Sequence, residues 1–266
     1  MVSAVNDEQR RRLREHMASV YACGQLVDAN GQSRSISPSG MPMASGNALR
    51  DLILAEGATE TLEVGLALGL STLHICDALM EYPDSGRHTA IDPLEESNFG
   101  NAGLMSLERA GVRDLVEHID LSSDLALPEL LRDRRGEFDF ALVDGAHWFD
   151  YAFLDAFFCM QLVRPGGVVV LDDTWMPGPR LAARYLALNL GCTVIPGVLP
   201  QTRLLGRRGQ LQPHWPHMTA LRTPVHGAFA RDRDAFFPFH DPQVSVRARL
   251  AGLGRSARRR LGSRGP

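Results

Sequence analysis

Two kinds of segment alternate along residues 41–190. Short runs of consecutive apolar residues, typical of strands buried on both faces, are separated by longer stretches with apolar residues at helical spacing. The clearest runs are FDFALVD at 138–144 and VVVLDD at 168–173. Regular alternation of strands and helices predicts an α/β fold with a doubly wound, mostly parallel sheet and helices on both of its faces.

The pattern predicts the approximate bounds of each strand and helix. The expected strands cover residues 61–65, 88–92, 116–120, 138–144 and 168–173, and the expected helices cover residues 45–56, 69–82, 102–110, 127–133, 149–162 and 179–190. The Pro-Gly-Gly sequence at 165–167 is expected to form a turn before the last of these strands. After residue 191 the pattern loosens, and residues 192–195 and 219–222 are the remaining strand candidates.

Both ends of the chain differ from this regular middle. Residues 1–40 are expected to form a charged, solvated helix followed by GQSRSISPSG, a mobile or wrapping segment that acts as lid or linker. The other end is crowded with arginine and has no acidic residue after Asp241, which predicts a disordered basic tail. We therefore expect three parts: residues 1–40, one domain over residues 41–245, and a tail over residues 246–266.

Composition narrows the class of protein. No apolar run among the 266 residues reaches the ~18 residues of a membrane span, and the four cysteines form no CxxC pair. With a net charge of −3, nucleic acid is not the expected partner, although the basic tail leaves an RNA- or membrane-touching arm as an alternative. We expect a cytoplasmic protein without a membrane partner. The chain has no lysine, so no lysine can serve as a general base.

The first predicted strand leads into a glycine-containing turn. Glu63, Gly65, Gly69 and Ser71 form an ExGxxxG pattern followed by a helix, whereas dinucleotide-binding proteins have GxGxxG. Glycines let the chain turn sharply and let a ligand approach the backbone. A zwitterionic amino-acid group would fit here, with Glu63 at its ammonium and Ser71 near its carboxylate. The alternative is a strand–helix turn that binds no ligand.

The next two strands also end in polar residues. Asp92 follows the second strand, where an acidic side chain can accept hydrogen bonds from both hydroxyls of a ribose. Ser122 follows the third strand and can meet the edge of an adenine. Each residue has a structural alternative, because Asp and Ser also cap helices and turns.

Three aspartates follow the two most apolar strands. Asp144 ends one, and Asp172 and Asp173 end the other, so all three are expected at the carboxyl edge of the sheet. Converging carboxylates repel one another unless one is protonated or a cation lies between them, and oxygen ligands suit Mg²⁺. We expect a magnesium site, the alternative being that one or two of these residues cap helices.

Three histidines are further candidates for functional residues. His147 lies three residues after Asp144 and could take a proton from a substrate hydroxyl held there. A hydrogen-bonded structural histidine is the alternative. His214 and His217 have HxxH spacing but no acidic neighbour in the sequence, and we interpret them as loop residues.

Together these segments resemble the class I S-adenosylmethionine-dependent methyltransferases, in the group of catechol O-methyltransferase and of metal-dependent sugar and antibiotic O-methyltransferases. The resemblance covers about half the chain. The stretches that carry it are MPMASGNALRDLI, TLEVGLALGLST, HTAIDP, FDFALVDGAHWFDY and LVRPGGVVVLDD.

The resemblance implies a Rossmann-like, seven-stranded sheet whose last strand is antiparallel. It implies S-adenosylmethionine contacts at Gly65, Ser71 and Asp92, supported by Glu63. The implied metal ligands are Asp144, Asp172 and Asp173, and Asp144 and His147 are the expected catalytic residues.

Two positions depart from the catechol-type pattern. His147 stands where those members have a lysine base, and Asp173 stands where they commonly have asparagine. Both departures favour a non-catechol acceptor, such as a sugar hydroxyl on a natural product. The chain could also form a homo-oligomer. The open alternatives are a metal-independent N- or RNA methyltransferase and a hydroxylase-like metal enzyme on the same scaffold.

Overall fold

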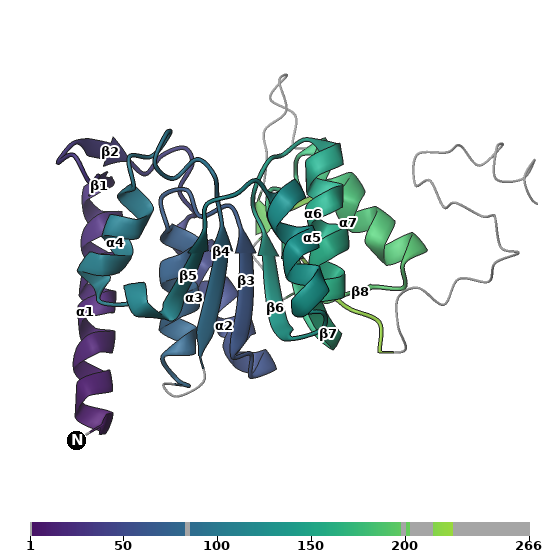
Figure 1. Ribbon diagram of the computed structural model, residues 1–266, viewed down its shortest axis with the longest axis horizontal. Coiled ribbons are helices and arrows are strands. Elements are labelled where there is room, and N and C mark those ends of the chain that lie inside the picture. Colours follow the sequence, from purple (N-terminus) through teal and green to yellow (C-terminus); the bar gives the residue numbers. More distant parts are fainter. Residues whose placement is uncertain (1, 83–85, 198–200, 203–214, 226–266) are drawn as a thin grey trace, which may run out of the picture. The chain divides into compact units, whose positions relative to one another are not determined.

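A computed structural model describes residues 2–82, 86–197, 201–202 and 215–225 (Figure 1). Every described residue belongs to one compact unit, which covers Met1–Ala230. The arginine-rich tail predicted at 246–266 lies outside the described residues, as does His214. No described helix is long and apolar enough to cross a membrane.

Seven helices and a seven-stranded sheet make up most of the described chain. The helices are α1 (Val2–Cys23), α2 (Met43–Glu56), α3 (Leu70–Leu79), α4 (Ala102–Ala110), α5 (Ser123–Asp133), α6 (Phe149–Leu162) and α7 (Pro177–Asn189), with a short 3₁₀ turn at Arg113–Leu115. The sheet strands are β3 (Glu60–Val64), β4 (Arg87–Ile91), β5 (Val116–Ile119), β6 (Phe138–Val143), β7 (Val163–Leu171), β8 (Thr193–Val194) and β11 (Thr219–Arg222). Two small hairpins pair β1 (Gln25–Val27) with β2 (Ser33–Ser35) and β9 (Gln201–Thr202) with β10 (Trp215–Pro216).

The sheet has the predicted doubly wound, mostly parallel topology. Its strand order is β5-β4-β3-β6-β7-β11-β8. The first five strands are parallel, and β11 runs antiparallel to both β7 and β8. The Rossmann-like fold and the antiparallel last strand of the chain are therefore confirmed.

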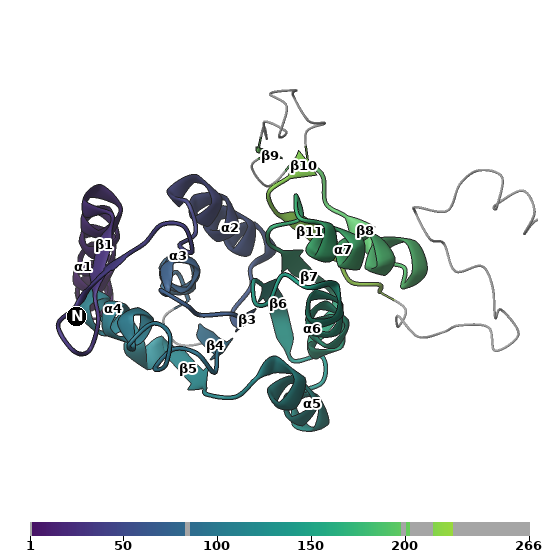
Figure 2. The same ribbon diagram turned by 90° about the horizontal axis from the view of Figure 1, so that it is seen from above.

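Alternating residues of the central strand show how the two faces are covered. Phe140 and Leu142 of β6 join the core formed with α1, α2, α3 and α4. Ala141 and Val143 belong to the other core, formed with α5, α6 and α7. Figure 2 shows α2 and α3 on one face of the sheet and α5 and α6 on the other. Because both faces are covered, the strand is apolar at nearly every position, and this explains why the sequence pattern located it correctly.

The prediction of a solvated N-terminal helix is wrong. Leu13, Met17 and Val20 of α1 are buried in the core beside α3 and α4. Their spacing of four and three residues places them on one face of the helix. The following segment forms the β1–β2 hairpin, in which Leu26 is also buried. Residues 1–40 therefore contribute to the core.

The turn predicted at residues 165–167 also needs correction, because these residues lie inside β7. Pairing with β6 jumps from Phe138–Val163 to Phe140–Val168, which leaves an irregular bulge between them. A side chain at Gly167 would collide with the Asp139 carbonyl oxygen and with Val163. The Pro-Gly-Gly sequence thus interrupts the ladder without ending the strand.

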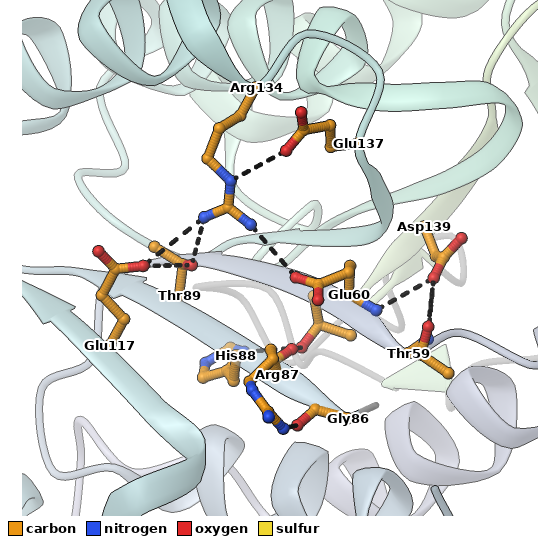
Figure 3. A network of polar contacts seen from close by, with 11 residues as sticks. Thr59, Glu60, Gly86, Arg87, His88, Thr89, Glu117, Arg134, Glu137 and Asp139 are labelled. Atoms are coloured by element: carbon orange, nitrogen blue, oxygen red, sulfur yellow. Dashed lines mark hydrogen bonds and ion pairs between the residues drawn. The ribbon is translucent and has the colours of Figure 1, made fainter. Parts of the chain in front are cut away.

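A network of polar contacts ties the amino ends of the strands to the residues just after α5 (Figure 3). The Arg134 guanidinium donates to Glu60 in β3 and to Thr89 in β4, each at 3.2 Å. It also lies 3.6 Å from a Glu117 oxygen in β5 and donates to Glu137 at 3.3 Å. One side chain thereby connects three strands at the edge opposite to the expected site.

We expect Arg134→Ala to lower the free energy of unfolding by about 1–2 kcal/mol. Each partly exposed ion pair contributes little, but the variant loses several at once, together with a cation–π contact 4.3 Å from the Phe138 ring centroid. Urea denaturation measures the change. Arg132→Ala, which removes an exposed arginine from α5, is the control and should change the value by less than about 0.5 kcal/mol. Equal stability of both variants would contradict a structural role for the network.

Candidate active site

The turn after β3 lies directly against the turn after β6. Gly65 has a φ of +97°, and a side chain there would overlap the backbone carbonyl of Asp144. The Gly65 amide donates to the Ile91 carbonyl at 2.9 Å, which fixes the turn to the end of β4. Glycine is required at this position because the backbones meet there and φ is positive. The predicted cofactor turn and the first predicted metal ligand therefore lie side by side.

The Glu63 carboxylate is completely buried beneath this turn. It accepts hydrogen bonds from the Ser71 hydroxyl, from the Thr72 hydroxyl at 2.6 Å and from the His88 Nε2 at 3.1 Å. Two of these donors lie in the first turn of α3, so Glu63 fixes the start of that helix to β3. Gly69, with a φ of +71°, precedes α3 and packs against Gly103. Direct cofactor contacts by Glu63, Gly69 and Ser71 stay predictions.

Asp92 holds the same turn from the second strand. One of its carboxylate oxygens accepts from the Ala67 amide at 2.7 Å, and the other accepts from the Leu94 amide at 2.8 Å. Glu95, which no motif in the sequence indicated, is buried nearby, and burial raises its pKa to about 7. Ser122 is the N-cap residue of α5 and makes no side-chain cap hydrogen bond. Ribose binding by Asp92 and adenine contact by Ser122 stay predictions.

The acidic residues of β6 and β7 meet at the neighbouring strand ends. The His147 Nε2 lies 2.9 Å from an Asp173 carboxylate oxygen and 4.0 Å from an Asp144 carboxylate oxygen. Asp173 adopts a φ of +49°, uncommon for a residue other than glycine. Its other oxygen accepts from the Trp175 indole at 2.7 Å. The structure thus brings together the predicted base and two of the predicted metal ligands.

A second histidine, His217, joins this cluster. It lies in the short connection between β10 and β11, as the interpretation of a loop residue expected, but it has acidic neighbours in space that the sequence did not indicate. The His217 Nδ1 lies 2.9 Å from an Asp172 carboxylate oxygen, and its Nε2 lies 3.6 Å from Asp173. His217 precedes β11, whose pairing with β7 carries it to the acidic edge. The HxxH spacing gave no sign of this, because the contact depends on strand pairing between segments more than forty residues apart.

Electrostatic interactions within the cluster are strong. Burial, followed by the neighbouring charge of Asp172, raises the pKa of Asp144 well above its usual value. Hydrogen bonds with Asp144 and Asp173 raise the pKa of His147 to about 10. Burial opposes ionisation of Asp173, but hydrogen bonds from His147 and Trp175 outweigh it and lower its pKa. A site with three converging carboxylates therefore favours bound positive charge.

The donor atoms of this cluster fit a divalent cation. Among the described residues, two groups have ligand atoms all within 4.8 Å of one another: Asp144, His147 and Asp173 form one, and Asp172, Asp173 and His217 form the other. Asp173 belongs to both groups. Carboxylate oxygens and imidazole nitrogens are common ligands of divalent metals. The three predicted metal ligands, Asp144, Asp172 and Asp173, therefore lie together at one edge of the sheet. Two imidazoles lie beside them.

Comparison with known proteins shows which proteins the chain is similar to. A methyltransferase domain profile matches residues 62–174, which contain the Gly65 turn and all three aspartates. The matched segment, less than half of the chain, is therefore similar to methyltransferase domains. It is 31% identical over 173 residues to a caffeoyl-CoA O-methyltransferase of Populus kitakamiensis, covering 63% of each chain. It is 31% identical over 140 residues to tapetum-specific methyltransferase 1 of Arabidopsis thaliana, covering 53% of this chain and 57% of that relative.

Solved structures agree on the fold of this chain. The O-methyltransferase TomG of Streptomyces achromogenes, solved with S-adenosylmethionine, is 27% identical over 70% of this chain and 83% of its own, with a TM-score of 0.53. A Bacillus cereus O-methyltransferase is 19% identical over 80% of this chain and 90% of its own, with a TM-score of 0.57, and supports the fold. The chain spans less than two thirds of the two curated relatives.

Proposed function

We propose that this chain transfers the methyl group of S-adenosylmethionine to a hydroxyl of a small molecule, assisted by a divalent cation. The observation that carries the proposal is the contact between Gly65 and Asp144, because it puts the cofactor turn beside the acidic cluster. The O-methyltransferase relatives and the cofactor-bound TomG structure support the same reaction. The carboxylates alone suggest Mg²⁺ as the cation.

The residues of the site have separate parts in this reaction. The turn from Gly65 to Gly69 would bind the amino-acid end of the cofactor, and Asp92 would accept from its ribose. Asp144, Asp172 and Asp173 would hold the cation, which acidifies and orients the acceptor hydroxyl when bound. The oxygen–methyl bond then forms as the sulfur–methyl bond breaks, and the bonding electron pair stays on sulfur. Holding both reactants in line lowers the barrier by several kcal/mol.

His147 is the proposed acceptor of the hydroxyl proton. Its imidazole is 41% exposed and lies within 4.0 Å of Asp144 and 2.9 Å of Asp173, so it can reach an acceptor held among these aspartates. A base must start neutral, and the two carboxylates alone raise its pKa to about 10. Proton acceptance at neutral pH therefore requires another positive charge at the carboxylates, which a divalent cation supplies.

We expect His147→Ala to lower kcat by about 10²–10³-fold while KM for the acceptor changes less than about threefold, because general-base catalysis acts in the transition state. The wild-type rate should rise with pH as the imidazole loses its proton, and the variant should lack this rise. His16→Ala, on α1, is the control. A wild-type pH–rate profile in the His147 variant would rule out His147 as the base.

The proposed function is tested by calorimetry with S-adenosylmethionine, with and without MgCl₂, followed by methyl-transfer assays on catechols and on hydroxylated sugars. We expect cofactor binding in the absence of metal and turnover that EDTA abolishes and a divalent cation restores. EDTA-resistant turnover would favour the metal-independent alternative. No binding of S-adenosylmethionine would favour the hydroxylase-like alternative.

A cytoplasmic location belongs to the same proposal. The four cysteines of the chain are all unpaired, and Cys76, Cys159 and Cys192 are buried. Unpaired thiols are typical of reducing compartments.

A further inference from the structure

His217 is held rigidly at the acidic edge, yet the proposed reaction gives it no part. The Thr174 amide donates to the His217 carbonyl at 2.9 Å, and the Thr174 hydroxyl donates to the same oxygen at 3.3 Å. Two residues later, Thr219 pairs with Leu171 in the sheet. These contacts fix the backbone of His217 beside the residues that end β7, so its imidazole lies against Asp172 and Asp173.

The hydrogen bond to Asp172 determines which ring nitrogen can bind a ligand. An ionised carboxylate only accepts, so the Nδ1 atom, 2.9 Å from Asp172 Oδ1, must be the donor. In the neutral ring the Nε2 atom then carries a lone pair. This atom lies 3.6 Å from Asp173 Oδ1, too far for a hydrogen bond. Two bonds of about 2.0–2.2 Å to a shared metal ion would span that separation.

This arrangement is the one commonly found around metal-bound histidines. A ligating imidazole usually donates its second N–H to a carboxylate, which fixes the tautomer and the ring orientation. Asp172 provides such a carboxylate, and Asp173 would be the neighbouring oxygen ligand. Asp173 is also shared with the group that contains Asp144 and His147. The His217 imidazole thus adds a nitrogen donor beside the shared carboxylate of Asp173, while His147 stays the proposed base.

Nitrogen ligands change which ion the site prefers. Magnesium binds oxygen, keeps several of its waters and dehydrates reluctantly. Imidazole suits iron, nickel, copper and zinc, and divalent first-row metals gain affinity for nitrogen-containing sites along the series from manganese to copper. The carboxylates alone would fit magnesium, but the complete donor set does not resemble a magnesium site.

We propose that His217 is a metal ligand through Nε2, and that it makes this centre select a first-row transition-metal ion over Mg²⁺. The inference rests on the proposed function only for the presence of a cation at this edge. It replaces the magnesium expected from the sequence by an ion that accepts both carboxylate and imidazole ligands.

The test compares metal selectivity in the full-length chain after removal of metal with a chelator. Calorimetry gives the affinities for Co²⁺ and Mg²⁺ in the wild type, in His217→Ala and in the control His16→Ala. Because transition ions bind most sites more tightly than magnesium does, the ratio of the two affinities is the readout. We expect His217→Ala to lower Co²⁺ affinity at least tenfold and Mg²⁺ affinity less than threefold, and His16→Ala to change neither.

Pulsed EPR of the Mn²⁺-loaded chain gives a second readout that does not depend on turnover or on a folded variant. We expect histidine-nitrogen coupling to Mn²⁺, and replacement of histidine nitrogen by ¹⁵N should change its frequency. The coupling should persist in His147→Ala. Absence of nitrogen coupling in the wild type, or an equal loss of Co²⁺ and Mg²⁺ affinity in His217→Ala, would overturn the assignment.

The same experiments separate this inference from the proposed function. Methyl transfer supported by Mg²⁺, without nitrogen coupling, would support the proposed methyltransferase activity and rule out His217 as a metal ligand. Selective Co²⁺ binding through His217 in a chain that does not bind S-adenosylmethionine would support His217 as a ligand and rule out the proposed reaction.

Discussion

Gly65→Ala should abolish measurable binding of S-adenosylmethionine and lower the free energy of unfolding by about 2–5 kcal/mol. The new methyl group would overlap the Asp144 carbonyl, and the φ of +97° is unfavourable for alanine. The obstructing atoms belong to the backbone at the end of β6, so no side chain can rotate away. Relief requires the turn to shift away from β6, which displaces the amides expected to bind the cofactor.

Gly136→Ala is the matched control for this prediction. Gly136 has a positive φ of +72°, but nothing lies within 4 Å of the position its side chain would occupy. It therefore carries the conformational cost without the collision, and we expect a loss of about 1 kcal/mol with cofactor affinity unchanged. Urea denaturation and calorimetry measure both variants. Cofactor affinity within threefold of wild type in Gly65→Ala would show that the turn is not part of the binding site.

The second large effect is expected from removal of the acidic ligands. Asp144→Ala and Asp172→Ala should each lower metal-dependent kcat at least 10³-fold, which corresponds to about 4 kcal/mol of transition-state stabilisation. S-adenosylmethionine should still bind within a fewfold of its wild-type affinity, because the Gly65 turn meets the backbone of Asp144, which the substitution leaves in place. Steady-state rates at several metal concentrations, together with calorimetry, measure both quantities.

Asp133→Asn controls for the loss of a carboxylate, because Asp133 is exposed in the last turn of α5. Its kcat should equal that of the wild type. Normal turnover in both Asp144→Ala and Asp172→Ala would disprove the metal assignment. Loss of cofactor binding in either variant would instead mean that the carboxylates support the fold of the turn.

The sequence predicted the sheet well because its central strands are buried on both faces. Phe140 and Leu142 pack into one core and Ala141 and Val143 into the other, so the strand is a continuous apolar run. A search for apolar runs did not reveal the buried face of α1. Leu13 and Met17 lie in a segment of the sequence that is rich in charged residues. The buried face of α1 depends on its contact with α3 and α4, which a local pattern does not reveal.

The site was predictable where its residues follow strand ends and was missed where it depends on strand pairing. Asp144, Asp172 and Asp173 directly follow parallel strands, and parallel strands bring their carboxyl ends to one edge. His217 reaches the same edge only because β11 pairs antiparallel with β7, in a register that the sequence does not specify. The bulge around Gly167 was missed for a related reason, since it exists only relative to β6.

Asp144 contributes to both halves of the site through different parts of the residue. Its main chain supports the Gly65 turn, and its carboxylate faces the histidines and the other aspartates. Under the proposed reaction, a change of this side chain would alter the chemistry offered to the acceptor and leave the backbone expected to receive the donor unchanged. Dependence on a metal ion would then be gained or lost by exchanging a few side chains, without a change of the main chain that serves the donor.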